Sequence, residues 1–236
     1  MGSDAQTPSQ QQPAHLAVYD FDGTCITGNS PAMLVPYLLA HRMLPFHRAI
    51  EIGFWALAYK LRLPQNESWV RSKVFSAFEG KPKADVDAFL AAFYDEKIAP
   101  RVRPAALASM RRDKEAGRLV VIVSASWSGI VARAARDLPF DHALTTRMVV
   151  DDEGRYTTQV DGVPVEGEEK VRALTRFANA AFAPGAWCVD AAYGDHHSDV
   201  PLLKTAARPC AVCPDNPLER EAKRRGWQIE NWSQGA

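Results

Sequence analysis

The sequence has few cysteines, no excess of charge of either sign and no apolar run long enough to span a membrane. Four cysteines in 236 residues are too few for the disulfide framework that stabilises small secreted proteins. Lys plus Arg and Asp plus Glu each number 28, so the formal net charge is zero. Such a chain has no overall field that attracts nucleic acid or an anionic membrane. A disulfide scaffold is therefore excluded, and no nucleic-acid partner is expected.

The remaining composition is that of an ordinary globular protein. Hydrophobic residues make up 47% and charged residues 24% of the chain, close to the average for soluble domains. The length suffices for one large domain with a smaller insert. Residues 1–13 are rich in Gln, Ser and Pro, which predicts a disordered tail and not a signal peptide. These features favour a cytoplasmic protein.

Two of the cysteines have a spacing that needs interpretation. Cys210 and Cys213 form a CxxC pair, a spacing found in redox motifs and in half of many zinc sites. No second CxxC or paired histidine cluster accompanies them, and they lie in an apolar run that ends at Pro214. Buried structural thiols are therefore the favoured interpretation.

The order of predicted elements indicates an α/β protein. After a first strand at 16–19, residues 30–100 are helical by pattern, contain no convincing strand and are divided by prolines into about four helices. Helices and strands then alternate: helix 105–116, strand 119–123, helix 127–137, hairpin 148–150 with 156–158, helix 168–181, strand 187–189, strand 210–212, and a final helix and strand.

Alternation of this kind, with continuous apolar strands, predicts a Rossmann-like, doubly wound parallel sheet covered on both faces. The helical block is then an inserted all-helical cap at the carboxyl edge of the sheet, where such folds bind ligands. The predicted organisation is a tail at 1–13, an α/β core at 14–30 and 98–236, and a helical cap domain at 31–97.

The most informative segment directly follows the first predicted strand. Asp20 and Asp22 are two residues apart, so both side chains begin on the same face of the strand. Like charges this close need a cation or hydrogen-bond donors to compensate them. Gly23 allows a sharp turn after them. An acid-rich turn with no chemical role is the alternative for this segment alone.

Two further segments carry groups that bind anions. Ser124 and Ala125 follow the strand 119–123, where a hydroxyl and backbone N–H groups at a helix start would form an anion cradle; an N-cap serine is the alternative. Lys170 lies near the start of a predicted helix, where its charge opposes the helix dipole. A solvated surface lysine is the alternative reading of that residue.

A third segment supplies more carboxylates. Asp195 and Asp199 lie in a loop after the strand 187–189, four residues apart. Together with Asp20 and Asp22 they give an all-oxygen site, which favours Mg²⁺ over zinc.

In this order, the segments resemble the haloacid-dehalogenase-like (HAD) hydrolase superfamily. The pattern is DxDGT at Asp20, a serine at Ser124, a lysine at Lys170 and GDxxxD ending at Asp199. The helical insert looks like the cap of the phosphoserine-phosphatase-like branch, subfamily IB. The resemblance covers the chain after about residue 14 and implies the HAD fold and a phosphatase.

The resemblance also implies a role for each motif residue. Asp20 would be the nucleophile that forms an aspartyl-phosphate, and Asp22 the general acid and base. Ser124, Ala125 and Lys170 would hold the phosphoryl oxygens.

The implied cofactor is Mg²⁺. It would bind Asp20, the backbone carbonyl of Asp22, and Asp195, with Asp199 completing or orienting the shell. A small-molecule phosphate ester is the expected substrate.

The substrate itself is less well defined. Phosphoserine phosphatases of this branch usually carry a Glu where this chain has Asn29, and an amide cannot pair with a substrate ammonium as a carboxylate does, so phosphoserine is disfavoured. Arg71 is a candidate for the cap arginine of the branch, or a surface residue. Trp127 is a candidate for the leaving-group pocket or for packing beneath the cap. His196 is a candidate for contact with substrate or metal, and exposure in a loop is the alternative for at least one of His196 and His197.

The first half of the insert is strongly apolar and leaves a second hypothesis open. Trp55 and Tyr59 are four residues apart, so one helix face could rest on a membrane surface. The alternative function is then a lipid-phosphate phosphatase, similar to phosphatidylglycerophosphatases, that acts on a lipid headgroup at the inner membrane surface. A phosphotransferase or mutase and a non-catalytic HAD scaffold complete the alternatives. The oligomeric state is not predicted.

Overall fold

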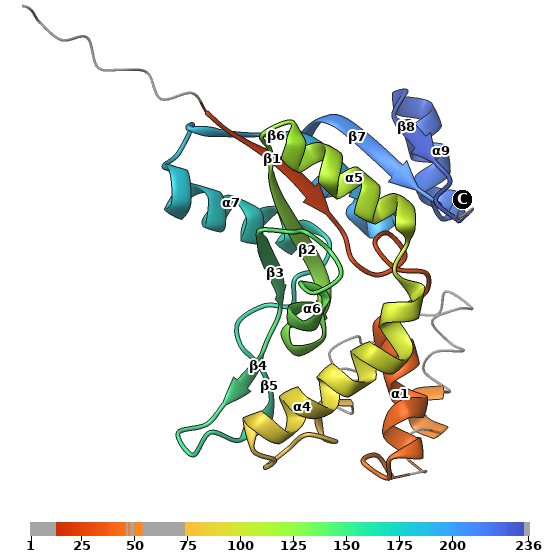
Figure 1. The fold of residues 1–236 in the computed structure, drawn as a ribbon, viewed down its shortest axis with the longest axis vertical. Helices are drawn as coiled ribbons and strands as arrows, with labels where there is room; N and C mark the ends of the chain where they lie inside the picture. Colours follow the sequence, from red (N-terminus) through yellow and green to blue (C-terminus); the bar gives the residue numbers. More distant parts are fainter. Residues whose placement is uncertain (1–12, 46, 48–49, 54–73, 234–236) are drawn as a thin grey trace, which may run out of the picture.

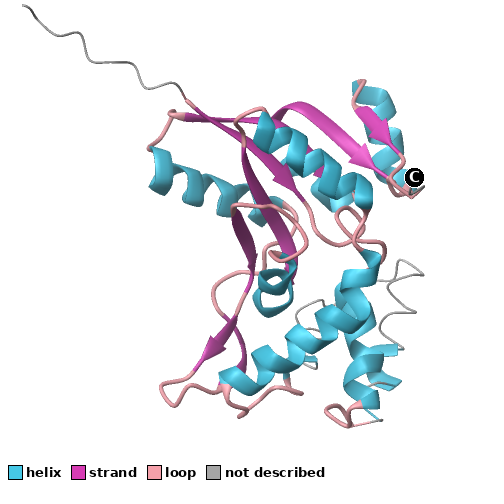
Figure 2. Cartoon of the chain, viewed as in Figure 1, coloured by secondary structure: helices cyan, strands magenta, loops and turns pink. Residues whose placement is uncertain are grey.

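The apolar runs of the sequence form a single six-stranded sheet. The computed structural model describes residues 13–45, 47, 50–53 and 74–233. All neighbouring strands are parallel, in the order β3-β2-β1-β6-β7-β8 (Figures 1 and 2). The strands are β1 (Ala14–Tyr19), β2 (Leu119–Trp127), β3 (His142–Thr146), β6 (Trp187–Gly194), β7 (Ala206–Val212) and β8 (Gln228–Glu230).

Both faces of this sheet are buried, which explains the continuous apolar strands. Along β1, Ala17 and Tyr19 join one apolar cluster, and Leu16 and Val18 join another on the opposite face. The first face is covered by α5 (Pro104–Glu115) and α6 (Ser128–Ala134), and the second by α7 (Glu168–Phe182), α8 (Val200–Leu203) and α9 (Asn216–Arg225). The predicted doubly wound α/β fold is confirmed.

The chain between β1 and β2 contains a helical insertion, which lies below the sheet in Figure 1. Its named elements are α1 (Ser30–Ala40), α4 (Lys83–Phe93), a π-helical turn at Tyr94–Ile98 and a 3-10 turn at Ala99–Arg101. Apolar side chains of α1 and α4 share one cluster with Tyr19 of the sheet. The division into separate cap and core domains stays a prediction.

A hairpin joins the core to this insertion. As predicted, β4 (Met148–Val150) and β5 (Tyr156–Val160) are antiparallel and form their own two-stranded sheet. Backbone hydrogen bonds link it to the insertion: Gly80 N–H donates to the Tyr156 carbonyl at 2.8 Å, and Tyr156 N–H donates to the Lys81 carbonyl at 3.0 Å. The hairpin therefore fixes the chain just before α4.

Several boundaries differ from the prediction. β2 does not end at Val123 but continues to Trp127, because Ser124 still pairs with Thr145 of β3. The next helix, α6, consequently begins at Ser128 and ends at Ala134. β3 was not expected, since His142–Thr146 holds little apolar surface and lies at the sheet edge. β6 and β7 are also longer than predicted.

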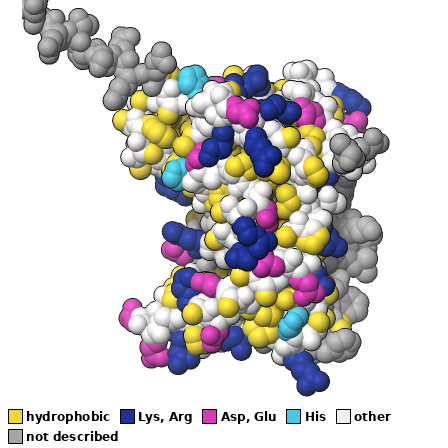
Figure 3. Space-filling view, viewed as in Figure 1, with side chains coloured by type: hydrophobic (Ala, Val, Ile, Leu, Met, Phe, Trp, Pro, Cys, Tyr) yellow, Lys and Arg dark blue, Asp and Glu magenta, His cyan; other side chains and the backbone are white. Residues whose placement is uncertain are grey.

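Other predictions concern the surface and the thiols. All four cysteines are free; Cys210 is buried, but Cys213 is only half-buried, so the buried-thiol interpretation is wrong for Cys213. Figure 3 shows positive and negative side chains interspersed over the visible face. Among the described residues, no helix is both long enough and apolar enough to cross a membrane. Residues 1–12 of the predicted tail lie outside the described residues.

Candidate active site

The polar residues predicted from the sequence meet at the carboxyl edge of the sheet. β1 lies between β2 and β6, so Asp20 stands between Ser124 in β2 and Asp195 directly after β6. A cavity of about 770 Å³ opens at this edge. Its wall includes most of the predicted site residues: Asp20, Asp22, Asn29, Ser124, Ala125, Lys170, Asp195, His196 and Asp199.

Lys170 is the central cation of this cavity. Its side chain is 5% exposed, and its Nζ lies 2.7 Å from Asp20 Oδ1 and 2.6 Å from Asp199 Oδ1. The alternative of a solvated surface lysine is therefore wrong. Burial alone would lower the pKa of Lys170, but the charges of Asp199 and Asp20 outweigh burial and raise that pKa above its usual value. The two carboxylates therefore favour the protonated, positively charged form of Lys170.

Three carboxylates converge around this lysine. One oxygen from each of Asp20, Asp195 and Asp199 lies within 4.8 Å of the others. Burial, followed by the charges of Asp20 and Asp199, raises the pKa of Asp195 to about 8. Burial raises the pKa of Asp20 to about 7, although Lys170 acts in the opposite direction. Three carboxylates facing one lysine leave negative charge that a divalent cation can compensate, and the all-oxygen donor set fits Mg²⁺.

Gly23 makes this convergence possible. Its φ angle is +74°, and a Cβ atom at this position would lie 1.9 Å from Asp195 Oδ2. The loop after β1 can therefore approach the loop after β6 only with a glycine here. Thr24 Oγ1 donates to Asp195 Oδ1 at 3.1 Å and orients that carboxylate. The sequence predicted the turn at Gly23 but not this close approach.

The Asp22 carboxylate contacts serines and not Lys170. Its carboxylate accepts hydrogen bonds from the Ser30 N–H at 2.6 Å, from the Ser30 hydroxyl at 3.0 Å and from the Ser126 hydroxyl. Burial raises the pKa of Asp22, while these donors oppose the rise. Sequence reasoning missed Ser30 and Ser126 as site residues. Their only sequence signal is that each lies close to a motif, Ser126 two residues after Ser124.

Arg103 is another cavity residue that the sequence did not indicate. It is 7% exposed, and its Nη2 donates to the Gly23 carbonyl at 3.1 Å. Its backbone N–H donates to the Cys25 carbonyl at 2.9 Å. Arg103 therefore holds the loop after β1 and adds a second positive charge to the cavity wall.

The segment predicted to bind phosphate has a different backbone than expected. Ser124 and Ala125 lie within β2, and the following helix is capped by Trp127 without a side-chain hydrogen bond. The predicted helix start at these residues and the N-cap serine are therefore wrong, and the binding of an anion by Ser124 and Ala125 stays a prediction. The buried Ser124 hydroxyl accepts from the Ser126 N–H at 3.2 Å. A hydroxyl in that position still has its own proton to donate to an anion.

Trp127 and Asn29 are placed by their packing and capping contacts. The Trp127 ring is 5% exposed and lies 4.6 Å from the ring of Phe75 and 5.8 Å from that of Phe78, both in the insertion. It packs beneath the insertion and is not among the described residues that line the cavity. Asn29 does line the cavity, and its Oδ1 accepts from the Ala32 N–H as the N-cap of α1.

The remaining substrate candidates divide into two groups. Arg71, Trp55 and Tyr59 lie outside the described residues. His197 is exposed, as predicted for at least one of the two histidines, and His196 is half-buried. Burial, then the neighbouring His197 charge, lowers the pKa of His196.

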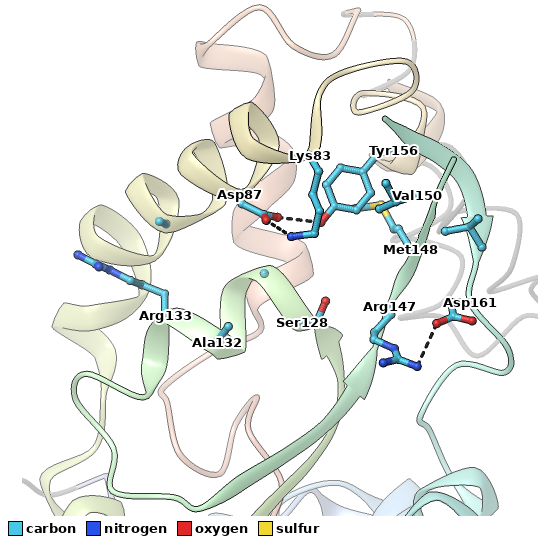
Figure 4. A pocket seen from close by; sticks show the side chains of 13 residues that line it. Lys83, Asp87, Ser128, Ala132, Arg133, Arg147, Met148, Val150, Tyr156 and Asp161 are labelled. Carbon is cyan, nitrogen blue, oxygen red and sulfur yellow. Dashed lines mark hydrogen bonds and ion pairs between the residues drawn. The ribbon is translucent and has the colours of Figure 1, made fainter. Parts of the chain in front are cut away.

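A second cavity, of about 800 Å³, lies between α4, α6 and the hairpin (Figure 4). There Asp87 accepts from the Tyr156 hydroxyl at 2.7 Å and pairs with Lys83, while Arg147 pairs with Asp161 at 3.0 Å. No predicted motif residue is among the described residues that line it. The candidate active site is therefore the cavity at the carboxyl edge of the sheet.

Comparisons with known proteins identify the family of the chain. The family described as haloacid dehalogenase-like hydrolase matches residues 17–204. A Mycobacterium tuberculosis protein named probable phosphatase is 29% identical over 97% of this chain and 79% of its own length. A Neisseria meningitidis histidinol-phosphatase is 25% identical over 92% of this chain and 99% of its own. A solved Bordetella pertussis protein of unknown function superimposes with a TM-score of 0.84 at 25% identity, covering 94% of this chain and 100% of that one.

Proposed function

We propose that this chain, a phosphoric monoester hydrolase of the haloacid dehalogenase-like hydrolase family, is a Mg²⁺-dependent phosphatase. In this proposal the enzyme forms an aspartyl-phosphate at Asp20. The observation that carries this proposal is the burial of Lys170 between Asp20 and Asp199, with Asp195 beside them, in one cavity. Buried charges of this kind are costly to a fold and mark a site built for chemistry.

Asp20 is the nucleophile in this proposal. Lys170 holds one oxygen of its carboxylate, which fixes the side chain at the end of β1. An anionic carboxylate must approach an anionic phosphate, and positive charge in the cavity lowers the repulsion between them. Mg²⁺ held by Asp20, the backbone carbonyl of Asp22 and Asp195, with Asp199 completing or orienting the shell, would supply two further positive charges there.

Asp22 is the general acid and base. A carboxyl group whose pKa is raised can retain its proton and donate it to the leaving alcohol. The Ser30 and Ser126 hydroxyls both contact it. Because a hydroxyl can accept as well as donate, these two serines support either protonation state of Asp22.

In this proposal the phosphoryl oxygens are bound by one positively charged side chain and by neutral hydrogen-bond donors. Lys170 supplies a fixed charge, and the Ser124 hydroxyl and the backbone of Ala125 line the same wall of the cavity. Binding groups that are already in place need little reorganisation when charge develops on the phosphate.

A small phosphorylated metabolite is the substrate class that we propose. A cavity of about 770 Å³ is of the size that holds small ligands. Asn29 presents an amide where a carboxylate would pair with the ammonium of phosphoserine, and its Oδ1 is already used to cap α1. A histidinol-phosphatase is among the relatives over nearly the full length of both chains.

The test is phosphate release from a panel of p-nitrophenyl phosphate, phosphoserine, histidinol phosphate and a lysophospholipid phosphate. Each is assayed with Mg²⁺, with EDTA and with Asp20→Asn. We expect turnover of a small phosphate that is lost in both controls. Rapid quenching with radiolabelled substrate should trap an acid-stable phosphoenzyme in the wild type only.

Other results would contradict particular parts of the proposal. Preference for the lysophospholipid would replace the small metabolite with a lipid headgroup. Phosphoenzyme without release of inorganic phosphate would indicate a phosphotransferase or mutase. Mg²⁺ binding with no turnover of any substrate would indicate a non-catalytic scaffold.

A further inference from the structure

A second group of metal-binding side chains lies beside the carboxylate cluster. His196 Nε2 is 3.5 Å from Asp215 Oδ2, and His197 Nδ1 is 3.2 Å from the same oxygen. One ligand atom from each of the three residues lies within 4.8 Å of the others. Both histidines also line the active-site cavity.

We propose that His196, His197 and Asp215 form a second cation site, for a divalent ion of the Zn²⁺ class. Two imidazole nitrogens and one carboxylate oxygen are the donor set of open zinc sites. In a tetrahedral zinc site with bonds of 2.0–2.1 Å, neighbouring donor atoms lie about 3.4 Å apart. The two distances to Asp215 Oδ2 are close to this value before any ion is added.

Neighbouring groups hold two of these side chains, Asp215 and His196, in this position. Asp215 Oδ1 accepts from the Leu218 N–H at 2.8 Å as the cap of α9, which leaves Oδ2 directed at the histidines. His196 Nδ1 accepts from the Ser198 N–H at 3.3 Å and lies 3.0 Å from Ser198 Oγ. A metal on Nε2 would require the ring proton on Nδ1, so the bond from the Ser198 N–H would be exchanged for donation from Nδ1 to Ser198 Oγ, the kind of partner that ligating histidines have.

This site differs in chemistry from the carboxylate cluster next to it. Nitrogen donors favour zinc-like ions, whereas the oxygen donors of Asp20, Asp195 and Asp199 favour Mg²⁺. The two sites are linked, because the Asp215 N–H donates to the Asp195 carbonyl at 2.8 Å. An ion on the histidines would therefore add positive charge to the cavity without taking the place of Mg²⁺.

A third cluster must be separated from this one in any binding experiment. His15, Cys188 and Asp190 also approach one another. Asp190 Oδ2 already accepts from Arg118 Nε at 2.8 Å. The Asp190 carboxylate and the Cys188 thiol both contact Nδ1 of His15. The substitution Cys188→Ser removes the thiol from this competing cluster, so it is included in every protein tested.

The test is titration of the full chain with Zn²⁺ by calorimetry, and with Co²⁺ by visible absorption, at saturating Mg²⁺. We expect one ion per chain, and a loss of affinity of at least tenfold in His197→Ala and in Asp215→Asn. Asn keeps a side-chain oxygen that can cap α9, so Asp215→Asn preserves the fold. His142→Ala, an exposed histidine outside the three clusters, is the matched control and should bind as the parent does.

Three results would overturn the proposal. The parent protein could bind no Zn²⁺ at saturating Mg²⁺. All variants could bind with the same affinity as the control. Alternatively, rising Mg²⁺ could displace the ion and Asp195→Asn could abolish its binding, which would place it among the carboxylates. Because the readout is binding, none of these results depends on phosphatase turnover.

Discussion

Two cavities lined by described residues have similar volumes but differ in how deeply their charged side chains are buried. The cavity between α4, α6 and the hairpin, of about 800 Å³, holds ion pairs whose side chains are largely exposed, 68% for Arg147 and 55% for Lys83. The cavity at the sheet edge, of about 770 Å³, holds Lys170 and Asp199 at 5% and 1% exposure. Exposed pairs contribute little to stability, and buried ones are costly to assemble. Charge burial, and not volume, distinguishes the candidate active-site cavity from the other one.

The largest difference between the cavities should appear in activity. Asp20→Asn removes the proposed nucleophile, and we expect kcat/KM to fall by about 10⁴-fold or more. Asp87→Asn makes the same chemical change in the second cavity and should keep kcat/KM within about twofold of the wild type. Both are measured by phosphate release with the preferred substrate. A similar loss in the two variants would erase the distinction drawn between the cavities.

The next largest effect concerns the buried lysine. Lys170→Met leaves the carboxylates of Asp20 and Asp199 without their cation, and we expect the free energy of unfolding to fall by about 3–5 kcal/mol at pH 8 without metal. Lys83→Met breaks an exposed pair with Asp87 and should cost about 0–1 kcal/mol. Urea unfolding followed by circular dichroism measures both. Equal losses of unfolding free energy in the two variants would show that the buried ion pairs of Lys170 stabilise the fold no more than the exposed pair of Lys83 does.

The carboxylate cluster should also make stability depend on pH and on Mg²⁺. The pKa of Asp195 is raised to about 8 and that of Asp20 to about 7, chiefly by burial. An acid with a higher pKa in the folded chain binds more protons there, so its contribution is full below pH 4 and is lost as pH rises to about 8. Without metal, stability should therefore fall over this range, by at most about 1.4 kcal/mol per pH unit for each proton.

Mg²⁺ should reverse that trend, because it binds the ionised carboxylates. At a hundredfold excess over its Kd it adds about 2.7 kcal/mol, with a larger effect at pH 8 than at pH 5. Unfolding in EDTA and in Mg²⁺ at several pH values measures the difference, and Asp195→Asn should flatten it. A Mg²⁺ effect that is the same at pH 5 and pH 8 would contradict the metal assignment.

The sequence was sufficient for the parts of the site that follow strands. Asp20 and Asp195 could be placed together because parallel strands end at one edge, and the order of Asp20, Lys170 and Asp195 along the chain matches the family pattern. The alternation of apolar residues in strands and helices likewise predicted the doubly wound core.

The parts that could not be predicted depend on contacts between distant segments. Ser30 and Ser126 meet at Asp22 although they are 96 residues apart, and neither has a local signal for that role. The extension of β2 to Trp127 depends on pairing with β3, whose own sequence is weakly apolar. Serines, a short edge strand and a buried arginine such as Arg103 acquire their roles only from tertiary packing.

The smallest predicted effect tests whether the second cavity is only structural. The Tyr156 hydroxyl donates to Asp87 at 2.7 Å, and the backbone of Tyr156 is bonded to the insertion. Tyr156→Phe keeps the ring and the backbone contacts, so only the hydrogen bond is lost, and we expect about 1 kcal/mol of destabilisation. A double-mutant cycle with Asp87→Asn should return most of that energy as coupling. Since neither group reaches the catalytic cavity, kcat/KM should stay within about twofold; a larger loss would mean that the joint between hairpin and insertion also sets the geometry at Asp20.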